Sequence, residues 1–454
     1  MKFRSCLLVL WSLSAVCLLA GLAAAEAVPE SLARAVAHRR LDRVAASAEI
    51  RPGPAAELRS ADGTVRLAWI FDLAPAGYVA VSADTGLPPV VAYSFESGAR
   101  TGPAPGNPLL ELLRADLGQR LEIATALPES ARGRLRAVWE DGLDGSRESR
   151  PAASFQQWPP AGTTPTGGWL ATNWTQNAPY NNLCPTDPVS GGRSLAGCPA
   201  VAMAQILNYL ESANGVAFSD ADDYYHNYAG RQFWIDNDYA ARGFPSWTQL
   251  NGYLAALQAH YDAHTPLTDT DKAALTWACG AAAHQVYTAG GSGTFGVDQA
   301  LQAYLRFGFT WVELLEPGDA DLLLRLAQNM KGAHPAHLAV VTPAWDAGHN
   351  VVVDGYNTDG FFHCNFGWGG AYNAWYLLPG GLPYNLTVIE GLVLDITGPP
   401  VPGDLNEDGA CDGADAVILA GYLAGSLSPG EGGFSAPYKR ADLDGDGAIR
   451  CADL

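Results

Sequence analysis

Three residues of different chemistry, Cys198, His349 and Asn365, occur in contexts suited to acyl transfer. Cys198 stands between Gly197 and Pro199, and proline is favoured at the first position of a helix. The run therefore predicts Cys198 at a helix N-terminus, where the helix dipole stabilises a thiolate and makes it a better nucleophile. A small buried cysteine at a helix start would explain this local run equally well.

His349 and Asn365 supply the partners that a thiol nucleophile needs. His349 leads into the apolar run 351–353, which predicts an imidazole at the mouth of a buried strand. Asn365 leaves the next predicted strand before a Gly-Trp-Gly-Gly turn, where its amide oxygen could fix the tautomer of the imidazole. Each residue alone is also typical of a loop or turn. His363 and His284 are rival candidates for the base.

The N-terminus has the pattern of a secretory signal peptide. Residues 1–4 are basic, residues 6–22 are apolar, and residues 23–25 are alanines that predict cleavage before Glu26. A membrane anchor is the alternative, but the apolar run is short. We expect a secreted protein with no membrane span after the signal is removed.

Charge and cysteine content limit the kinds of partner and cofactor that we expect for this chain. The net charge of −20 disfavours nucleic acid and anionic membranes as partners. The sequence has no Cys-x-x-Cys pattern of the kind that binds zinc, and we expect no cofactor for catalysis. An exported chain can form disulfides, and the spacing leaves their connectivity open. Six cysteines follow the signal: Cys184, Cys198, Cys279, Cys364, Cys411 and Cys451.

The order of elements predicts an α+β fold. Helical spacing is found at 28–50 and 108–124, and strand patterns at 65–71 and 77–82. A proline- and glycine-rich linker follows at 151–167. The main domain, 168–397, begins with helices and continues with strands, which suggests two subdomains. Its expected elements are helices after Cys198 and near 246–260 and 270–287, then strands at 338–341, 351–354 and 360–365.

Two acidic loops after a second linker, 398–403, have the spacing of calcium-binding EF-hand loops. Residues 404–415 and 442–453 carry oxygen ligands at the expected positions, with Gly409 and Gly447 at position 6. Arg450 cannot ligate, so water would serve at that position of the second loop. The predicted calcium ligands are Asp404, Asn406, Asp408, Asp412, Asp415, Asp442, Asp444, Asp446 and Asp453.

Taken together, the run 169–185, the Cys198 run, Ala278-Cys279-Gly280, the His349 strand and the 365–370 turn resemble the streptopain (C10) family of papain-like cysteine peptidases. The resemblance covers about residues 168–397 and implies a bacterial, two-subdomain peptidase that cleaves protein or peptide substrates. It also implies these roles: Cys198 as nucleophile, His349 as general base and then acid, Asn365 as its orienter, Gln176 as an oxyanion donor, and Trp368 as a shield of the Asn–His bond.

The sequence departs from that family in three places near the site. Phe366 replaces a tryptophan, and Asn350 replaces the small apolar residue that usually follows the histidine. Pro199 has no N–H and cannot serve as an oxyanion donor. These differences bear on rate and specificity more than on the class of reaction.

The flanking segments resemble partner domains of known kinds. Residues 77–94 look like the streptopain-type prodomain, which implies a small α+β domain that blocks the cleft as an intramolecular inhibitor until the linker is cut. We hypothesise that the enzyme cuts the linker itself. The paired calcium loops resemble a type I dockerin with 417–423 as its first helix, which implies a cohesin-like docking partner. Positions 413–414 and 451–452 differ from the hydroxyl pairs of many cellulosomal dockerins.

The sequence thus predicts six segments: signal peptide 1–25, inhibitory prodomain 26–150, linker 151–167, peptidase 168–397, linker 398–403 and an incomplete calcium-binding module 404–454. The leading hypothesis is a secreted, self-processing cysteine endopeptidase. A non-catalytic secreted inhibitor or adhesion protein, or an acyl-transferring enzyme with the same triad, is the alternative.

Overall fold

The computed structural model describes residues 27–44, 51–95 except 61, six helical positions between 113 and 139, 155–397 except 320, 379–381 and 383–385, and 403–426 except 407–410 and 412. Within these residues, no helix combines the length and the apolar character that crossing a bilayer requires. The predicted signal peptide and the second calcium loop lie outside them.

The N-terminal segment is a helix packed on four strands. The expected helix over 28–50 is confirmed over Glu30–Val44 (α1), and its buried face carries Val36 and Leu41. The two predicted strands are also present, and each pairs antiparallel with its neighbour. Leu113, Leu117 and Leu121 of the expected 108–124 helix are helical as well. The four strands are β1 (Arg51–Arg59), β2 (Arg66–Ala74), β3 (Tyr78–Ser82) and β4 (Val90–Ser94).

Residues 155–397 form a helical half followed by a strand-rich half, as the order of predicted elements indicated. The helical half contains α4 (Cys198–Tyr209), the 3-10 turn Asp220–Asp222, β6 (Tyr224–Tyr228), β7 (Arg231–Ile235), α5 (Tyr239–Arg242), α6 (Trp247–Asp262), α7 (Asp269–Ala282) and α8 (Asp298–Arg306). The strand-rich half contains β8 (Glu313–Leu315), α9 (Leu322–Lys331), β9 (Ala336–Val341), β10 (Gly348–Asn357), β11 (Phe362–Asn365), β12 (Ala374–Tyr376) and β13 (Val388–Leu394). The expected helix after the first calcium loop is α10 (Gly413–Leu423).

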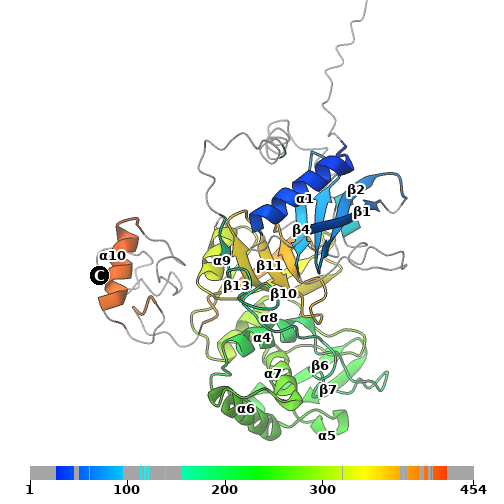
Figure 1. Cartoon of the computed structure of the whole chain (residues 1–454). Helices are drawn as coiled ribbons and strands as arrows, with labels where there is room; N and C mark the ends of the chain where they lie inside the picture. Colours follow the sequence, from blue (N-terminus) through cyan, green and yellow to red (C-terminus); the bar gives the residue numbers. More distant parts are fainter. Residues whose placement is uncertain are drawn as a thin grey trace, which may run out of the picture.

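One sheet joins the N-terminal segment to the strand-rich half. Its order is β1-β2-β3-β4-β12-β11-β10-β9-β13-β8, and the junction is the antiparallel pair of β4 with β12. Figure 1 shows α1 lying across β1–β4 at one end of the molecule, while α5, α6 and α7 lie toward the other end. The N-terminal segment is thus built into the same sheet as β10, which carries His349.

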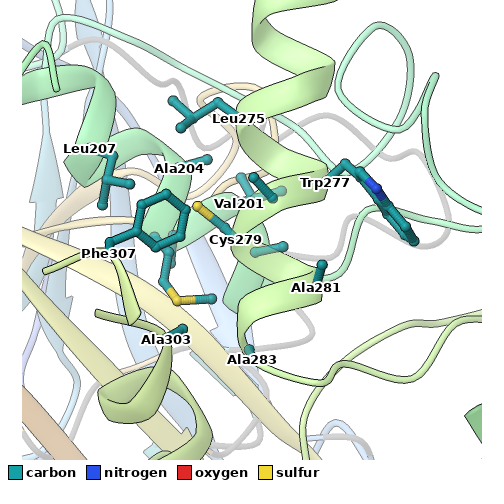
Figure 2. Close-up of a cluster of buried hydrophobic side chains, with 14 of the residues drawn as sticks. Val201, Ala204, Leu207, Leu275, Trp277, Cys279, Ala281, Ala283, Ala303 and Phe307 are labelled. Carbon is teal, nitrogen blue, oxygen red and sulfur yellow. The ribbon is translucent and has the colours of Figure 1, made fainter. Parts of the chain in front are cut away.

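A continuous apolar core lies behind Cys198. Val201, Ala204 and Leu207 of α4 pack against α7 and Phe307, as Figure 2 shows. The same cluster includes Val352 of β10, so the first helix of the domain is held directly against the strand that carries His349. Burial of this apolar surface, at about 25 cal/mol per Å², fixes the position of the α4 N-terminus.

Two boundaries differ from the sequence prediction. Part of the predicted linker belongs to the sheet, because β5 (Gln157–Trp158) pairs with Tyr356 and Asn357, and the Trp158 ring stacks on Tyr356. The helix predicted over 270–287 ends at Ala282. His284 adopts a left-handed φ of 47°, which ends the helix and lets the next residues form a bridge with Gly293.

Candidate active site

Cys198 is the first residue of α4, as predicted, and it is partly exposed. Gly197 caps the helix with a φ of 86°, and a Cβ at this position would lie 2.6 Å from the amide of Gln285. That amide donates to the carbonyl of Ala196 at 2.7 Å. Glycine is therefore required at 197, because both the backbone conformation and the close approach of Gln285 exclude a side chain.

His349 is buried at the start of β10 between aromatic rings. Its imidazole stacks on Trp368 with ring centroids 4.3 Å apart, and on Phe366 at 5.8 Å. Nε2 lies 2.9 Å from the carbonyl oxygen of Phe366 and must donate to it, since a carbonyl only accepts. Burial lowers the pKa of His349 to about 4, although the bond to Phe366 works in the opposite direction. The imidazole is neutral, and its Nδ1 carries the lone pair.

Asn365 is fully buried, but its amide bonds to groups other than His349. Nδ2 donates to the carbonyl of Thr172 at 2.9 Å, while Oδ1 accepts from the Gly367 N–H at 3.0 Å and from Gln205 at 3.3 Å. The predicted hydrogen bond between Asn365 and His349 is thus replaced by the bond from His349 to the Phe366 backbone. Asn365 holds the turn that supplies this carbonyl.

Gln176 lies beside the segment that leads into Cys198. Its backbone carbonyl accepts from the N–H of Ala196 at 2.9 Å, and its side chain is half-buried. In the described part of the chain, the side-chain amide of Gln176 forms no hydrogen bond. This position is compatible with the expected oxyanion role, which stays a prediction.

The sulfur of Cys198 contacts Asn350 and forms no hydrogen bond with His349 among the described residues. Asn350 Nδ2 lies 3.9 Å from Sγ. Burial raises the pKa of the Cys198 thiol, while the backbone N–H and the side chain of Asn350 lower it in part. With the pKa of the thiol raised and that of the imidazole lowered, both groups are neutral near pH 7, and they form no ion pair with each other.

Two polar residues of the site were not identified from the sequence. Gln205 is fully buried; it donates to Asn365 and accepts from the Trp174 N–H at 3.1 Å. It follows Cys198 by seven residues on α4, two helical turns on the same face, and that spacing was the signal. His337 of β9, which bonds to Asn350 at 2.7 Å, gave no such signal because it stands in an apolar strand.

The rival bases lie elsewhere. His363 is completely buried in β11 and forms a 2.6 Å hydrogen bond with Asp354 through Nδ1. The other carboxylate oxygen of Asp354 accepts from the Leu170 N–H at 3.1 Å, so this pair secures the start of the peptidase domain. His284 stacks on Tyr224. Neither histidine hydrogen-bonds to Cys198 in the described residues.

The remaining described cysteines are free thiols. Cys184, Cys279 and Cys364 are buried, and burial raises the pKa of each, that of Cys184 to about 12. Cys411 is exposed. The possible Cys411–Cys451 pairing involves a residue outside the described ranges. Cys198 and Cys411 are thus the described thiols that solvent reaches.

Part of the first calcium loop is described. Asp404 and Asp415, at positions 1 and 12, are both buried, and Asp415 Oδ1 accepts from the Leu405 N–H at 2.7 Å and the Asn406 N–H at 3.3 Å. Two buried carboxylates at the ends of an acidic loop fit a calcium ion. Within 403–406, 411 and 413–426 no cluster of three metal-binding side chains is complete, and the other predicted ligands, Asp408, Asp412, Asp442, Asp444, Asp446 and Asp453, lie outside the described residues.

Comparison with known proteins identifies two domains. The model of the peptidase C10 family matches residues 174–376, and that of the dockerin type I domain matches residues 402–454. The thiol protease/hemagglutinin PrtT of Porphyromonas gingivalis is 27% identical over 325 residues, which are 67% of this chain. The chain spans only about a third (33%) of that protein's length.

Two solved structures from Prevotella intermedia are also similar. A fragment of prointerpain A is 24% identical and aligns over 76% of this chain and 99% of the fragment, with a TM-score of 0.47. Active interpain A is 25% identical and aligns over 53% of this chain and 96% of its own, with a TM-score of 0.39. The two family matches thus show a cysteine-type peptidase domain of the C10 family over residues 174–376 and a type I dockerin domain over residues 402–454.

Proposed function

We propose that this chain is an exported cysteine endopeptidase, made as a zymogen, that hydrolyses proteins through a thioacyl-enzyme on Cys198. The observation that carries the proposal is the placement of Cys198 at the N-terminus of α4, a helix that packs against the strand carrying His349, inside a C10 peptidase domain. A thiol at a helix N-terminus beside an imidazole is suited to nucleophilic catalysis.

The tautomer of His349 assigns the roles of its two nitrogens. Nε2–H is bonded to the Phe366 carbonyl, so Nδ1 is the atom that would take the proton of the Cys198 thiol. The thiolate then attacks the peptide carbonyl carbon, the imidazolium gives its Nδ1 proton to the departing amine, and water attacks the thioacyl carbon to release the acid and the thiol. Gln176 would donate to the oxyanion.

Latency is supported by the same geometry. The thiol is protonated, the imidazole is neutral, and Asn350 occupies the sulfur contact. Activation would require His349 to move its Nδ1 into contact with Sγ and form the ion pair. Loss of the N-terminal domain, which shares its sheet with β10, is a change in the molecule that would permit this movement.

The place of processing follows from β5. Because Gln157 and Trp158 are part of the sheet, a cut that leaves the peptidase intact would fall before Phe155, within residues 141–154. We propose that the enzyme makes this cut itself. The N-terminal sequence of the mature protein, compared between wild type and Cys198→Ala, tests both points. Identical shortening of the two precursors would contradict self-processing.

We also propose that the enzyme is secreted and that its dockerin domain binds a partner. The signal-like residues 1–25 support secretion. The dockerin domain supports calcium binding, with Asp404 and Asp415 among the ligands, and a cohesin-like partner that would hold the enzyme at a surface or scaffold.

Labelling with a thiol-directed epoxide, followed by mass mapping, tests the catalytic assignment. We expect Cys198 to be labelled preferentially and Cys198→Ala to lose both the label and hydrolysis of a denatured protein substrate. Cys411→Ala is the matched control, since Cys411 is also exposed and lies outside the peptidase domain. Equal labelling of Cys198 and Cys411, with no hydrolysis, would favour a non-catalytic protein. Product formation that depends on an added amine would favour acyl transfer.

A further inference from the structure

Asn350 contacts the nucleophile directly, although its place in the sequence suggests only a spacer after His349. It lies on β10 next to His349, and successive side chains of a strand point to opposite faces. Val352, two residues on, packs in the core behind Cys198, whereas Val351 packs in the core of the sheet. Asn350 therefore shares the face of Val352, toward α4, and its Nδ2 lies 3.9 Å from Cys198 Sγ.

The amide of Asn350 is held in one orientation by a buried chain of hydrogen bonds. Its Oδ1 lies 2.7 Å from Nε2 of His337, and His337 Nδ1 lies 3.2 Å from the hydroxyl of Tyr304. An amide oxygen only accepts, so His337 carries its proton on Nε2 and accepts from Tyr304 through Nδ1. With Oδ1 engaged in this way, Nδ2 is directed at the sulfur.

Among the described residues, burial and hydrogen bonds, rather than a charged side chain, shift the pKa of the Cys198 thiol. The buried titratable groups on the elements packed against α4 include Cys279 of α7, Tyr304 of α8, His337 of β9 and His349 of β10. Burial raises the pKa values of Cys279 and Tyr304 and lowers those of His337 and His349 to about 4. All four are neutral near pH 7, so the stabilisation of a thiolate falls to dipoles, namely the α4 N-terminus and the amide of Asn350.

We propose that Asn350 is a positioning residue of the peptidase: through Nδ2–H, oriented by His337 and Tyr304, it holds the Cys198 sulfur and stabilises its thiolate. This inference rests on the proposed function for its catalytic meaning, but the effect on the sulfur is measurable without turnover.

The test is the pH dependence of Cys198 alkylation by iodoacetamide, in which the thiolate displaces iodide, measured on the full chain with Cys411→Ala. Asn350→Ala removes the side-chain donor and should raise the midpoint by roughly one pH unit, about tenfold less thiolate at a fixed pH. Asn350→Asp replaces the donor by a carboxylate and should raise it further. His337→Leu leaves the Asn350 amide free to turn and should raise the midpoint by part of the amount seen in Asn350→Ala. His337→Gln can still donate to Oδ1 and should keep the midpoint close to the wild-type value.

Val352→Ala is the matched control, because Val352 lies on the same face of β10 and packs behind the nucleophile without donating a hydrogen bond. It should leave the midpoint unchanged. A midpoint that is equal in wild type, Asn350→Ala and Asn350→Asp would overturn the proposal, as would an equal shift in Val352→Ala. If the midpoints move as expected but no variant, wild type included, hydrolyses protein, the proposed peptidase function fails and the contact between Asn350 and Cys198 stands.

Discussion

His349 donates its Nε2–H to the backbone carbonyl of Phe366 over 2.9 Å, so a main-chain atom sets the tautomer of the candidate base. A side-chain amide was expected in this place. Asn373 in turn accepts from the Phe366 N–H at 2.9 Å, so both backbone polar groups of Phe366 are hydrogen-bonded. The tautomer therefore depends on the conformation of the turn that follows β11.

Asn365 should matter for activity because it holds that turn. Asn365→Ala removes the acceptor for the Gly367 N–H and the donor to Thr172, and leaves Gln205 with an unpaired buried amide, at a cost of about 1–3 kcal/mol in stability. Misplacement of His349 by about 1 Å would lower kcat/KM by about 10²-fold. Asn365→Asp keeps the acceptors and should lose less. Steady-state kinetics beside urea unfolding separates the two effects, and wild-type kcat/KM in Asn365→Ala would contradict this role.

Trp368 should control the basicity of His349, because its ring excludes water from one face of the imidazole. Trp368→Ala should raise the pKa of His349 from about 4 toward the ordinary value of 6.5, since relief of burial favours the charged form. NMR titration of the ring protons measures the shift. Trp345→Ala removes a tryptophan that is 62% exposed and should leave the titration unchanged.

Stability should fall on mild acidification because two histidines are buried in the neutral form. His337 and His349 have pKa values lowered to about 4, so between about pH 6.5 and pH 4 the unfolded chain binds protons that the folded chain does not. The stabilisation is complete above pH 6.5 and declines as pH falls, by about 2 kcal/mol per histidine at pH 5. Urea unfolding at pH 7.5 and pH 5 measures this loss. His337→Gln should show a smaller loss than wild type, and an equal loss would contradict the assignment.

The ion pair between Arg40 and Asp359 should help to hold the N-terminal domain against the peptidase domain. Arg40 of α1 lies 2.5 Å from Asp359, in the turn between β10 and β11, and Arg43 contacts the same carboxylate. Although burial works in the opposite direction, the two arginines lower the pKa of Asp359, so the contact persists at neutral pH and is lost as pH falls through that pKa. Asp359→Asn leaves Arg40 buried without its charged partner and should weaken docking by about 3 kcal/mol.

Two assays report how firmly the N-terminal domain is held on the peptidase domain. The first is the protease activity of the uncut precursor, and the second is cleavage within residues 141–154 by an added protease. Each should rise in Asp359→Asn. Arg34→Ala is the control, since Arg34 lies on the same helix but contacts Glu30, Gly53 and Phe71, all within the N-terminal segment. Unchanged latency in Asp359→Asn would show that docking does not depend on this ion pair.

Calcium should order the dockerin domain through Asp415. Isothermal titration of the full chain after chelator treatment should show binding, and Asp415→Asn should weaken it, because this residue lies at position 12 of the loop and organises residues 405 and 406. Asp269→Asn, an exposed carboxylate of α7, should bind calcium as wild type does. Equal affinity in Asp415→Asn would remove Asp415 from the ligand set.

Local patterns predicted the elements that carry the site, but not the contacts between them. The helix at Cys198 and the strand at His349 were predictable because Gly197, Pro199 and the apolar run 351–353 act over a few residues. Which of His349 and Asn350 touches the sulfur depends on the face that β10 turns toward α4, and adjacent positions of a strand exchange faces with a one-residue change of register.

The pairing of strands that are far apart in the chain was also not predictable from local sequence patterns. Nothing local relates Tyr93 to Trp375, yet their pairing joins two domains into one sheet. The linker composition of residues 151–167 likewise concealed Trp158, whose aromatic surface favours packing on Tyr356 over exposure to water.

The pairing of β4 with β12 has a consequence for the enzyme after maturation. Departure of the N-terminal domain would leave Ala374–Tyr376 as a free strand edge, flanked by the apolar rings of Phe361 and Trp375 that Tyr93 now covers. Such an edge is a template for any extended chain. Loss of the N-terminal domain would therefore expose a strand edge on the far side of β11 from β10, and the released domain, a free peptide or another copy of the enzyme would compete for it.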